Sequence, residues 1–368
     1  MSGVLDLVRP DLRDFGGYVS ARREGGRGRV WLNANESPWR SDVDMDVGRD
    51  AAPVGLNRYP EPQPPALIER LAAFYGVGRE RLAATRGSDE GIDLLVRALC
   101  RAGEDAVLVA PPTFGMYAVA ARVQNAPLRT VPLVREGLHW RVDAEAVVAA
   151  ARHEGARLVF LCSPGNPTGE TVPLATVARI AGALGGQAVV AVDEAYGEYA
   201  PPERSALALL DAHPNLVVLR TLSKAHALAG ARVGVVLGDP ALVRVLRNIS
   251  APYPLPAPSV ALALQALDTL PLASTRSRVA QVVHERARLA AALAAMPEVV
   301  AVHPSDANFL LVRFADADAA LAALARAGVV VRDMRHLPDL GDALRISIGA
   351  PAENDAVIAA LAPAAGAA

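Results

Sequence analysis

Short apolar segments alternate with segments of helical periodicity from about residue 66 to residue 237. Uninterrupted apolar runs are typical of strands buried on both faces, and apolar residues spaced three or four apart are typical of helices that cover a sheet. The alternation predicts an α/β fold with a large, mainly parallel sheet flanked by helices. We expect strands at 106–110, 158–162, 188–192, 216–219 and 233–237, and helices at 66–75, 89–101, 115–123, 143–152, 174–184 and 205–210.

The pattern changes after four prolines between positions 252 and 258. A long helical stretch over 259–295, with a break near Pro271, is followed by short strands and further helix, which predicts a smaller α+β domain. We therefore expect an N-terminal arm (1–40), a large domain (41–255) and a small C-terminal domain (256–368). In the small domain the predicted strands are 299–302, 308–313, 329–332 and 344–348, and a helix is predicted at 317–327.

Composition and charge exclude several classes of protein. Of the 368 residues, 52% are hydrophobic and 21% charged, which supplies a large core and excludes a disordered chain. A formal net charge of -2 does not provide the basic face that nucleic-acid binding needs. The N-terminal residues lack the pattern of a secretory signal, and the longest uncharged run, 248–267, contains four prolines. We expect a cytoplasmic protein without a membrane span.

Cysteine and histidine positions do not predict a metal site. Cys100 and Cys162 lie in apolar surroundings, and neither these cysteines nor the seven histidines have the spacing of a metal-binding motif. Buried free thiols in a reducing compartment are the simpler expectation.

Lys224 is the sole lysine in the sequence, since the other 36 of the 37 basic residues are arginine. A desolvated lysine amine is a nucleophile that forms Schiff bases with carbonyl compounds, which a permanently protonated guanidinium cannot do. The alternative is a surface lysine whose amine reaches solvent. Because arginine serves at every other basic position, the sequence favours a chemical role for Lys224, which follows the predicted strand 216–219.

Asp193 directly follows the preceding predicted strand, 188–192. The carboxyl ends of parallel strands meet along one edge of a sheet, so Asp193 and Lys224 are expected to share a site. A carboxylate at that place can hold the protonated nitrogen of a pyridine ring. The alternative role for an aspartate after a strand is to cap the N-terminus of a helix.

Two further motifs follow apolar segments. Residues 163–169 read Ser-Pro-Gly-Asn-Pro-Thr-Gly, a composition typical of a turn. In the functional interpretation, Asn166 donates a hydrogen bond to a ring oxygen of a cofactor. Residues 86–91 are predicted to begin a helix, and the free N–H groups of its first turn can bind a phosphate. The alternative is that Ser88 caps the helix, although the residues that follow do not complete a capping box. Dinucleotide and P-loop motifs are absent from the sequence. Together the motifs predict a phosphate cradle, an oxygen ligand, a ring-nitrogen partner and a Schiff-base lysine.

In this order, the motifs resemble those of the fold-type-I pyridoxal-phosphate (PLP) aminotransferases of class II, and among them the histidinol-phosphate aminotransferase family. The resemblance extends over almost the whole chain. It rests on Trp-Leu-Asn-Ala-Asn-Glu at 31–36, Asn-Arg-Tyr-Pro at 57–60, Gly-Ser-Asp-Glu-Gly at 87–91, Asn-Pro-Thr-Gly at 166–169, Asp-Glu-Ala-Tyr at 193–196, Leu-Ser-Lys-Ala at 222–225, Ala-Pro-Tyr-Pro at 251–254 and Leu-Arg-Ile-Ser at 344–347.

The resemblance implies transamination between L-histidinol phosphate and 2-oxoglutarate, giving imidazole-acetol phosphate and L-glutamate, with the reverse direction used in histidine biosynthesis. It implies a homodimer, a PLP-binding large domain, and Lys224, Asp193 and Tyr196 as catalytic residues. It further implies that PLP contacts Ser88, Asp89, Phe114, Asn166, Asp193, Tyr196, Ser223, Lys224, Arg232 and, from the partner subunit, Tyr59. Substrate would contact Tyr18, Asn166, Arg332 and Arg345.

Three residues depart from the pattern of the family. Phe114 stands where tyrosine is frequent, Gly165 where asparagine is frequent, and His226 where phenylalanine is usual. We expect His226 to be a packed ring, and its alternative role is to tune Lys224 or gate the substrate. The alternative functions are a threonine-phosphate decarboxylase-like enzyme, an aminotransferase for aromatic amino acids, and a PLP-binding regulator without turnover.

Overall fold

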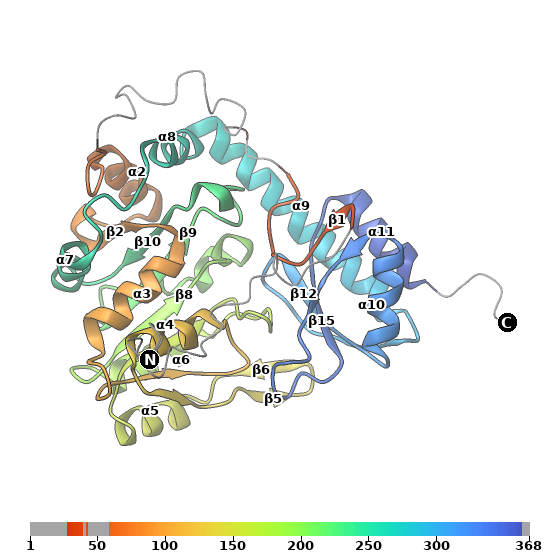
Figure 1. The fold of residues 1–368 in the computed structure, drawn as a ribbon, viewed down its shortest axis with the longest axis horizontal. Helices are drawn as coiled ribbons and strands as arrows, with labels where there is room; N and C mark the ends of the chain where they lie inside the picture. Colours follow the sequence, from red (N-terminus) through yellow and green to blue (C-terminus); the bar gives the residue numbers. More distant parts are fainter. Residues whose placement is uncertain (1–27, 40–41, 43–58, 363–368) are drawn as a thin grey trace, which may run out of the picture.

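The computed structural model describes residues 28–39, 42 and 59–362. These residues form a large part built on a seven-stranded sheet and a smaller part built on a four-stranded sheet (Figure 1). Within the described residues, no helix combines the length and the apolar character needed to cross a membrane.

The large sheet confirms the predicted mainly parallel arrangement. Its strand order is β2-β10-β9-β8-β7-β3-β4, and β10 runs antiparallel to both of its neighbours while the other pairs are parallel. Strands β2 and β4 were not predicted. The strands are β2 (Leu82–Thr85), β3 (Ala106–Val109), β4 (Leu128–Thr130), β7 (Ala156–Cys162), β8 (Val189–Asp193), β9 (Leu216–Thr221) and β10 (Gly234–Leu237).

Alternate residues of each central strand enter two different cores, which explains the continuous apolar runs. On β8, Val190 and Val192 pack into one core, whereas Ala191 packs into the other. The first core is completed by α2 (Pro65–Tyr75), α5 (Ala144–His153), α6 (Leu174–Ala183) and α8 (Ala257–Ala266), and the second by α3 (Gly87–Leu99), α4 (Met116–Gln124) and α7 (Pro240–Ile249). The helix predicted at 205–210 is instead a 3-10 turn, η6 (Ala206–Leu209).

The smaller part contains an antiparallel sheet in the order β11-β12-β15-β14. A separate parallel pair joins the N-terminal strand β1 to β13, so residues close to position 30 pack with this part of the molecule. The elements are β1 (Val30–Trp31), β11 (Val299–Val302), β12 (Phe309–Phe314), α10 (Ala317–Arg326), β13 (Val329–Val330), β14 (Arg332–Asp333), β15 (Ala343–Ser347) and α11 (Pro351–Leu361).

Helix α9 (Thr269–Ala294) connects the two parts (Figure 1). The helical stretch breaks at 267–268, and Pro271 lies in the first turn of α9, where its missing N–H would have no partner in the helix. Leu267 packs into the core of the large sheet, whereas Val282 and Leu289 of α9 pack into the core of the small sheet. The domain boundary at 255/256 stays a prediction.

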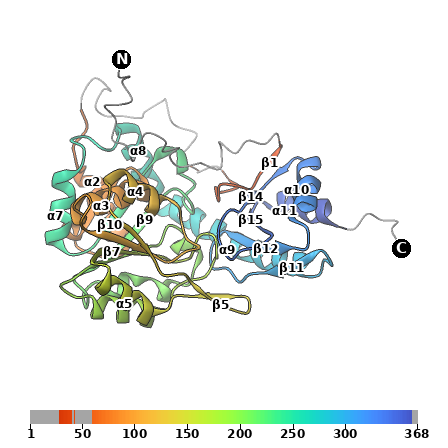
Figure 2. The same ribbon diagram turned by 60° about the horizontal axis from the view of Figure 1, so that its bottom comes forward.

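A hairpin formed by β5 (Val134–Glu136) and β6 (His139–Arg141) reaches from the large part to the small one (Figure 2). Its turn places the carbonyl oxygen of Leu138 2.6 Å from Nδ1 of His303. Nearby, Asp306 accepts a hydrogen bond from Thr171 and forms an ion pair with Arg204 at 2.9 Å. These contacts join the large part to the small part.

Candidate active site

A cavity of about 670 Å³ lies where β7, β8 and β9 end, and residues of β14 and β15 close it from the small part. It brings together most of the predicted site residues. Those that line it are Ser88, Asp89, Phe114, Asn166, Asp193, Tyr196, Ser223, Lys224, Arg232, Arg332 and Arg345. Tyr59 does not line it: its side chain is 80% exposed and stacks on Tyr253 with 4.4 Å between ring centroids. Tyr18 lies outside the described residues.

Lys224 is placed in the cavity by the loop that follows β9. Its Nζ donates a hydrogen bond to the carbonyl oxygen of Ala34 at 3.1 Å. Burial of the amine, together with the positive charge of Arg345, lowers the pKa of Lys224 from 10.5 to about 8. A substantial share of the amine is therefore unprotonated at neutral to mildly alkaline pH, which is the nucleophilic form.

The lowered pKa predicts the reactivity of Lys224 in the protein without bound ligand. The rate at which an amine-directed reagent modifies Lys224 should rise with pH around a midpoint near 8, because deprotonation creates the nucleophile. Since the sequence holds one lysine, mass spectrometry of the lysine peptide follows this site alone. Arg345→Gln should move the midpoint upward. A midpoint at the ordinary value of 10.5 would contradict the assigned environment.

Asp193 ends β8 and is buried at the base of the cavity. Its Oδ2 accepts a hydrogen bond from the Tyr117 hydroxyl at 2.9 Å, and its Oδ1 accepts one from the backbone N–H of Ala195 at 3.1 Å. A carboxylate can accept about four hydrogen bonds, so it retains capacity for a further donor from a ligand. Burial raises the pKa of Asp193 to about 6, although both donors act in the opposite direction.

Because its pKa is raised, Asp193 is expected to lower the free energy of unfolding of the ligand-free protein as pH rises. Between the ordinary pKa of 3.8 and about 6, the folded state binds more protons than the unfolded state, so this group lowers stability as pH rises. From pH 4 to pH 8, Asp193→Asn should therefore gain about 2 kcal/mol in unfolding free energy relative to the unsubstituted protein. Urea unfolding at both pH values measures the difference, and a pH-independent difference would refute the expectation.

The N-terminal end of α3 forms an anion-binding corner. The helix begins at Gly87, and Arg86 at the N-cap position makes no side-chain capping bond, so the alternative of Ser88 as the cap is wrong. Gly87 has φ +73°, and a Cβ there would lie 2.5 Å from Nη2 of Arg232. Glycine thus admits the guanidinium next to the free N–H groups of the first turn, an arrangement that suits a phosphate.

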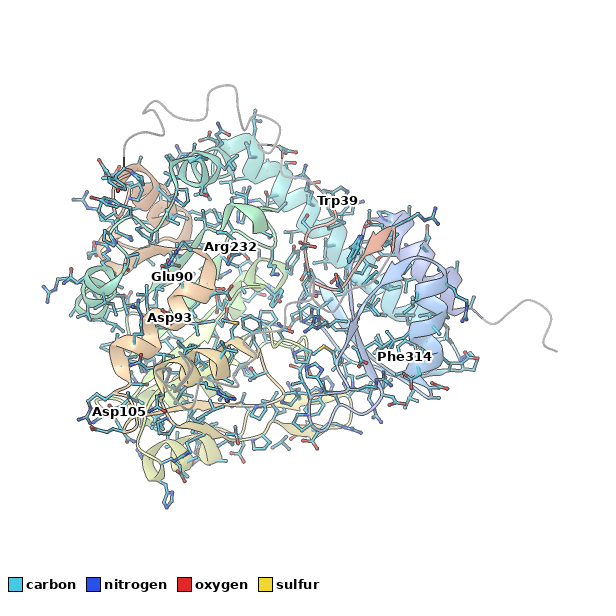
Figure 3. All side chains as sticks on the ribbon, in the orientation of Figure 1. Trp39, Glu90, Asp93, Asp105, Arg232 and Phe314 are labelled. Carbon is cyan, nitrogen blue, oxygen red and sulfur yellow. The ribbon has the colours of Figure 1, made fainter. Side chains whose placement is uncertain are left out.

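Arg232 lies beside the end of α3 that carries Glu90 (Figure 3). Its Nη2 lies 3.1 Å from Oδ2 of Asp89, and its Nη1 donates to the Ser223 hydroxyl at 3.4 Å. These two partners come from α3 and from the loop that carries Lys224. The predicted phosphate ligands are therefore neighbours in space, although Asp89 and Arg232 lie 143 residues apart in sequence.

Two arginines from the small sheet face the opposite side of the cavity. Arg332 of β14 and Arg345 of β15 are directly paired across the antiparallel strands, so both side chains lie on the same face of the sheet. Arg345 donates to Oδ1 of Asn166 at 2.6 Å and to the carbonyl oxygen of Asn33 at 2.8 Å. Paired guanidinium groups provide the donor forks that carboxylates and phosphates require.

The sequence did not assign roles to Tyr117, Asn33, Ala34 or Asn35, which the structure places against the predicted residues. Tyr117 stacks on Phe160 at 4.5 Å and has the pattern of an ordinary core aromatic, so no residue pattern indicated its bond to Asp193. The Asn-Ala-Asn segment was part of the family resemblance, but its contacts depend on tertiary structure.

His226 is a buried, packed ring, as expected. It lies edge-on to Phe74 of α2 with 5.5 Å between ring centroids, and burial lowers its pKa to about 4. It is therefore neutral near pH 7. Among the described residues, no group of three or more histidine, cysteine, aspartate or glutamate side chains is placed to hold a metal ion.

Comparisons with known proteins agree with this geometry. Residues 29–361 match the family model for aminotransferase class I and II. The chain is 58% identical to histidinol-phosphate aminotransferase of Stenotrophomonas maltophilia over 97% of this chain and 96% of that protein. It is 54% identical to histidinol-phosphate aminotransferase of Xylella fastidiosa, with 97% and 96% covered.

A solved structure extends the similarity to the fold. The crystal structure of histidinol-phosphate aminotransferase from Sinorhizobium meliloti in complex with pyridoxal-5'-phosphate matches with a TM-score of 0.83 at 27% identity, and the match covers 96% of each chain. The expected fold-type-I architecture is thereby confirmed. The chain belongs to the class I and II aminotransferases and, within them, to the histidinol-phosphate aminotransferase family.

Proposed function

We propose that this protein catalyses PLP-dependent transamination between L-histidinol phosphate and 2-oxoglutarate, giving imidazole-acetol phosphate and L-glutamate, and works in the reverse direction in histidine biosynthesis. The observation that carries the proposal is the convergence of Lys224, Asp193 and Arg345 on one cavity. Identity of 58% with a histidinol-phosphate aminotransferase over nearly the full chain supports the choice of substrate.

The residues of the cavity fit PLP in charge and in donor type. The buried Asp193 carboxylate retains accepting capacity for a ring N–H, and the corner formed by Ser88, Ser223 and Arg232 suits a phosphate. Phe114 lines the cavity and offers an aromatic face for stacking on the ring. Lys224 supplies the amine that attaches the cofactor.

When bound, PLP supplies the electron sink that makes the substrate Cα–H bond acidic. In our proposal, Asp193 keeps the ring nitrogen protonated by holding its hydrogen. Lys224, whose amine would hold the cofactor, would also serve as the base that takes up the Cα proton of the substrate and gives it back during the transfer of the amino group. Its lowered pKa suits this work, because the amine must be able to take up and to give back a proton near neutral pH.

The two arginines are proposed to serve both substrates. Arg345 would bind the carboxylate of glutamate or 2-oxoglutarate in one half-reaction, and Arg332 with Arg345 would bind the phosphate of histidinol phosphate in the other. Asn166 fixes one end of the Arg345 guanidinium through the 2.6 Å bond and also lines the cavity. Tyr18 stays a predicted substrate contact.

The proposal is tested by recording the absorption spectrum of the PLP-loaded protein before and after addition of L-histidinol phosphate without a keto acid. We expect conversion to the spectrum of the pyridoxamine form, and recovery of the first spectrum on addition of 2-oxoglutarate. If the protein carries PLP on Lys224 but its spectrum does not change with histidinol phosphate, the result would favour a threonine-phosphate decarboxylase-like enzyme or an aminotransferase for aromatic amino acids. A protein that takes up no PLP would refute the proposal.

We also propose a cytoplasmic homodimer with Tyr59 reaching the partner's site. Support for the dimer comes from the stacked pair of Tyr59 and Tyr253, which leaves an exposed aromatic surface. Support for the cytoplasm comes from the free thiols Cys100 and Cys162. We expect Lys224→Ala and Tyr59→Ala each to lose activity, and mixing the two proteins should restore part of it through hybrid dimers. Mixtures that remain inactive while exchanging subunits would exclude the crossing of Tyr59.

A further inference from the structure

Three consecutive residues of the N-terminal segment contact three different side chains of the site. The carbonyl oxygen of Asn33 accepts a hydrogen bond from Arg345, and that of Ala34 accepts one from Lys224. The third contact is made by a side chain: Nδ2 of Asn35 donates to the Tyr196 hydroxyl oxygen at 3.0 Å. Asn35 is thus the member of the segment whose contribution can be altered by substitution.

Asn35 is held rigidly. It is 1% exposed and has φ +52°, a left-handed conformation that asparagine tolerates better than most residues. Its backbone N–H donates to the Ser347 hydroxyl oxygen at 2.9 Å, and that hydroxyl donates to Oδ1 of Asn35 at 2.9 Å. Asn308 donates to its carbonyl oxygen at 3.1 Å. With Oδ1 occupied by Ser347, the amide directs Nδ2 at Tyr196.

The Tyr196 oxygen receives a second hydrogen bond, from Nδ2 of Asn166 at 3.4 Å. A hydroxyl oxygen has two accepting positions and one hydrogen to donate. Asn35 and Asn166 fill both accepting positions, so the hydrogen is directed to a third group. Burial raises the pKa of Tyr196, which keeps that hydrogen in place at neutral pH.

We propose that Asn35 is a positioning residue that directs the Tyr196 hydroxyl hydrogen into the cavity, where it is donated to the ring oxygen of PLP. This inference rests on the proposed function, because it requires PLP in the cavity that Tyr196 lines. The hydrogen bond then depends on a residue more than 160 positions away in the sequence and held by the small sheet.

The test is cofactor binding to Asn35→Asp, which keeps the size of the side chain but replaces the donating NH₂ group by an acceptor. The Tyr196 hydroxyl would then donate to the new carboxylate instead of to the ligand. Protein freed of cofactor is titrated with PLP and with the PLP analogue that lacks the ring hydroxyl, and equilibrium dialysis gives both Kd values. We expect the Kd for PLP to rise about ten- to a hundredfold, the effect of one hydrogen bond to a charged group, while that of the analogue changes little.

A double-mutant cycle separates this role from packing. In the Tyr196→Phe background, Asn35→Asp should no longer change the ratio of the two Kd values. Equal weakening of PLP and analogue, or no weakening of either, would overturn the inference. If Asn35→Asp does not fold, Ser347→Ala frees the amide to rotate and should produce a smaller shift of the same ratio. Failure of the unsubstituted protein to bind PLP would refute the proposed function instead.

Discussion

Replacement of Lys224 by alanine is expected to lower the rate of transamination by a factor of about 10³ or more, because it removes the amine that we propose both attaches the cofactor and moves the Cα proton. Single-turnover mixing of the PLP-loaded variant with histidinol phosphate measures the loss directly. PLP should still bind, since Asp193 and the corner around Arg232 remain, but reduction with borohydride should no longer fix it to the chain.

Two controls separate the chemistry of Lys224 from its charge. Lys224→Arg keeps a positive charge and a long side chain but cannot attach the cofactor, so it should be as inactive as the alanine variant. A small primary amine added to Lys224→Ala should restore part of the proton-transfer rate, because it can occupy the space left by the side chain. Transamination at the normal rate in Lys224→Ala would refute the assignment of the site.

Replacement of Asp193 by alanine is expected to lower transamination by about 10²- to 10⁴-fold. The loss leaves the positive ring nitrogen buried without its partner, and breaking a buried ion pair costs about 3–5 kcal/mol. The measured quantity is the rate of the half-reaction with histidinol phosphate at saturating substrate. Binding of substrate should change less than the rate, because the arginines that would hold it are untouched.

The effect of Asp193 should be specific to its position. Asp211→Asn is a suitable control, because the side chain of Asp211 is 95% exposed on the surface and should leave the rate unchanged. Asp193→Asn can be used to measure both the rate of transamination and the stability of the ligand-free protein. The same substitution should gain stability between pH 4 and pH 8 relative to the unsubstituted protein and should slow the reaction, since the buried negative charge is costly to the fold and, in the proposed function, holds the cofactor.

The pattern of residues predicted most of the large sheet. Strands β3, β7, β8, β9 and β10 overlap the predicted apolar runs, because burial on both faces leaves room for little but apolar side chains. Strand β4 was not predicted because none of its three residues is buried and one of them is Arg129. The segment 205–210 has helical spacing but forms a 3-10 turn, where Glu194 accepts hydrogen bonds from Ser205 and from the backbone of Ala206.

The site residues also divide into those that the sequence predicted and those that it did not. Lys224, Asp193 and Asn166 were identifiable because each lies just after a strand that was predicted from an apolar run. In a parallel sheet the carboxyl ends of such strands lie along the same edge. Their roles toward PLP stay predictions that the variants above test. The orientation of Arg345 could not be predicted, because it depends on Asn166, 179 positions away, and on the backbone of Asn33.

Residue types and their order therefore determined the fold class, the family and the chemical groups available for catalysis. The tertiary structure decided how those groups are tuned: the burial that lowers the pKa of Lys224, the Tyr117 hydroxyl on Asp193, and the Asn35 amide on Tyr196. The physical reason is that periodicity records which faces of an element are apolar, a local property. Hydrogen-bond direction and desolvation depend instead on which distant segments come together.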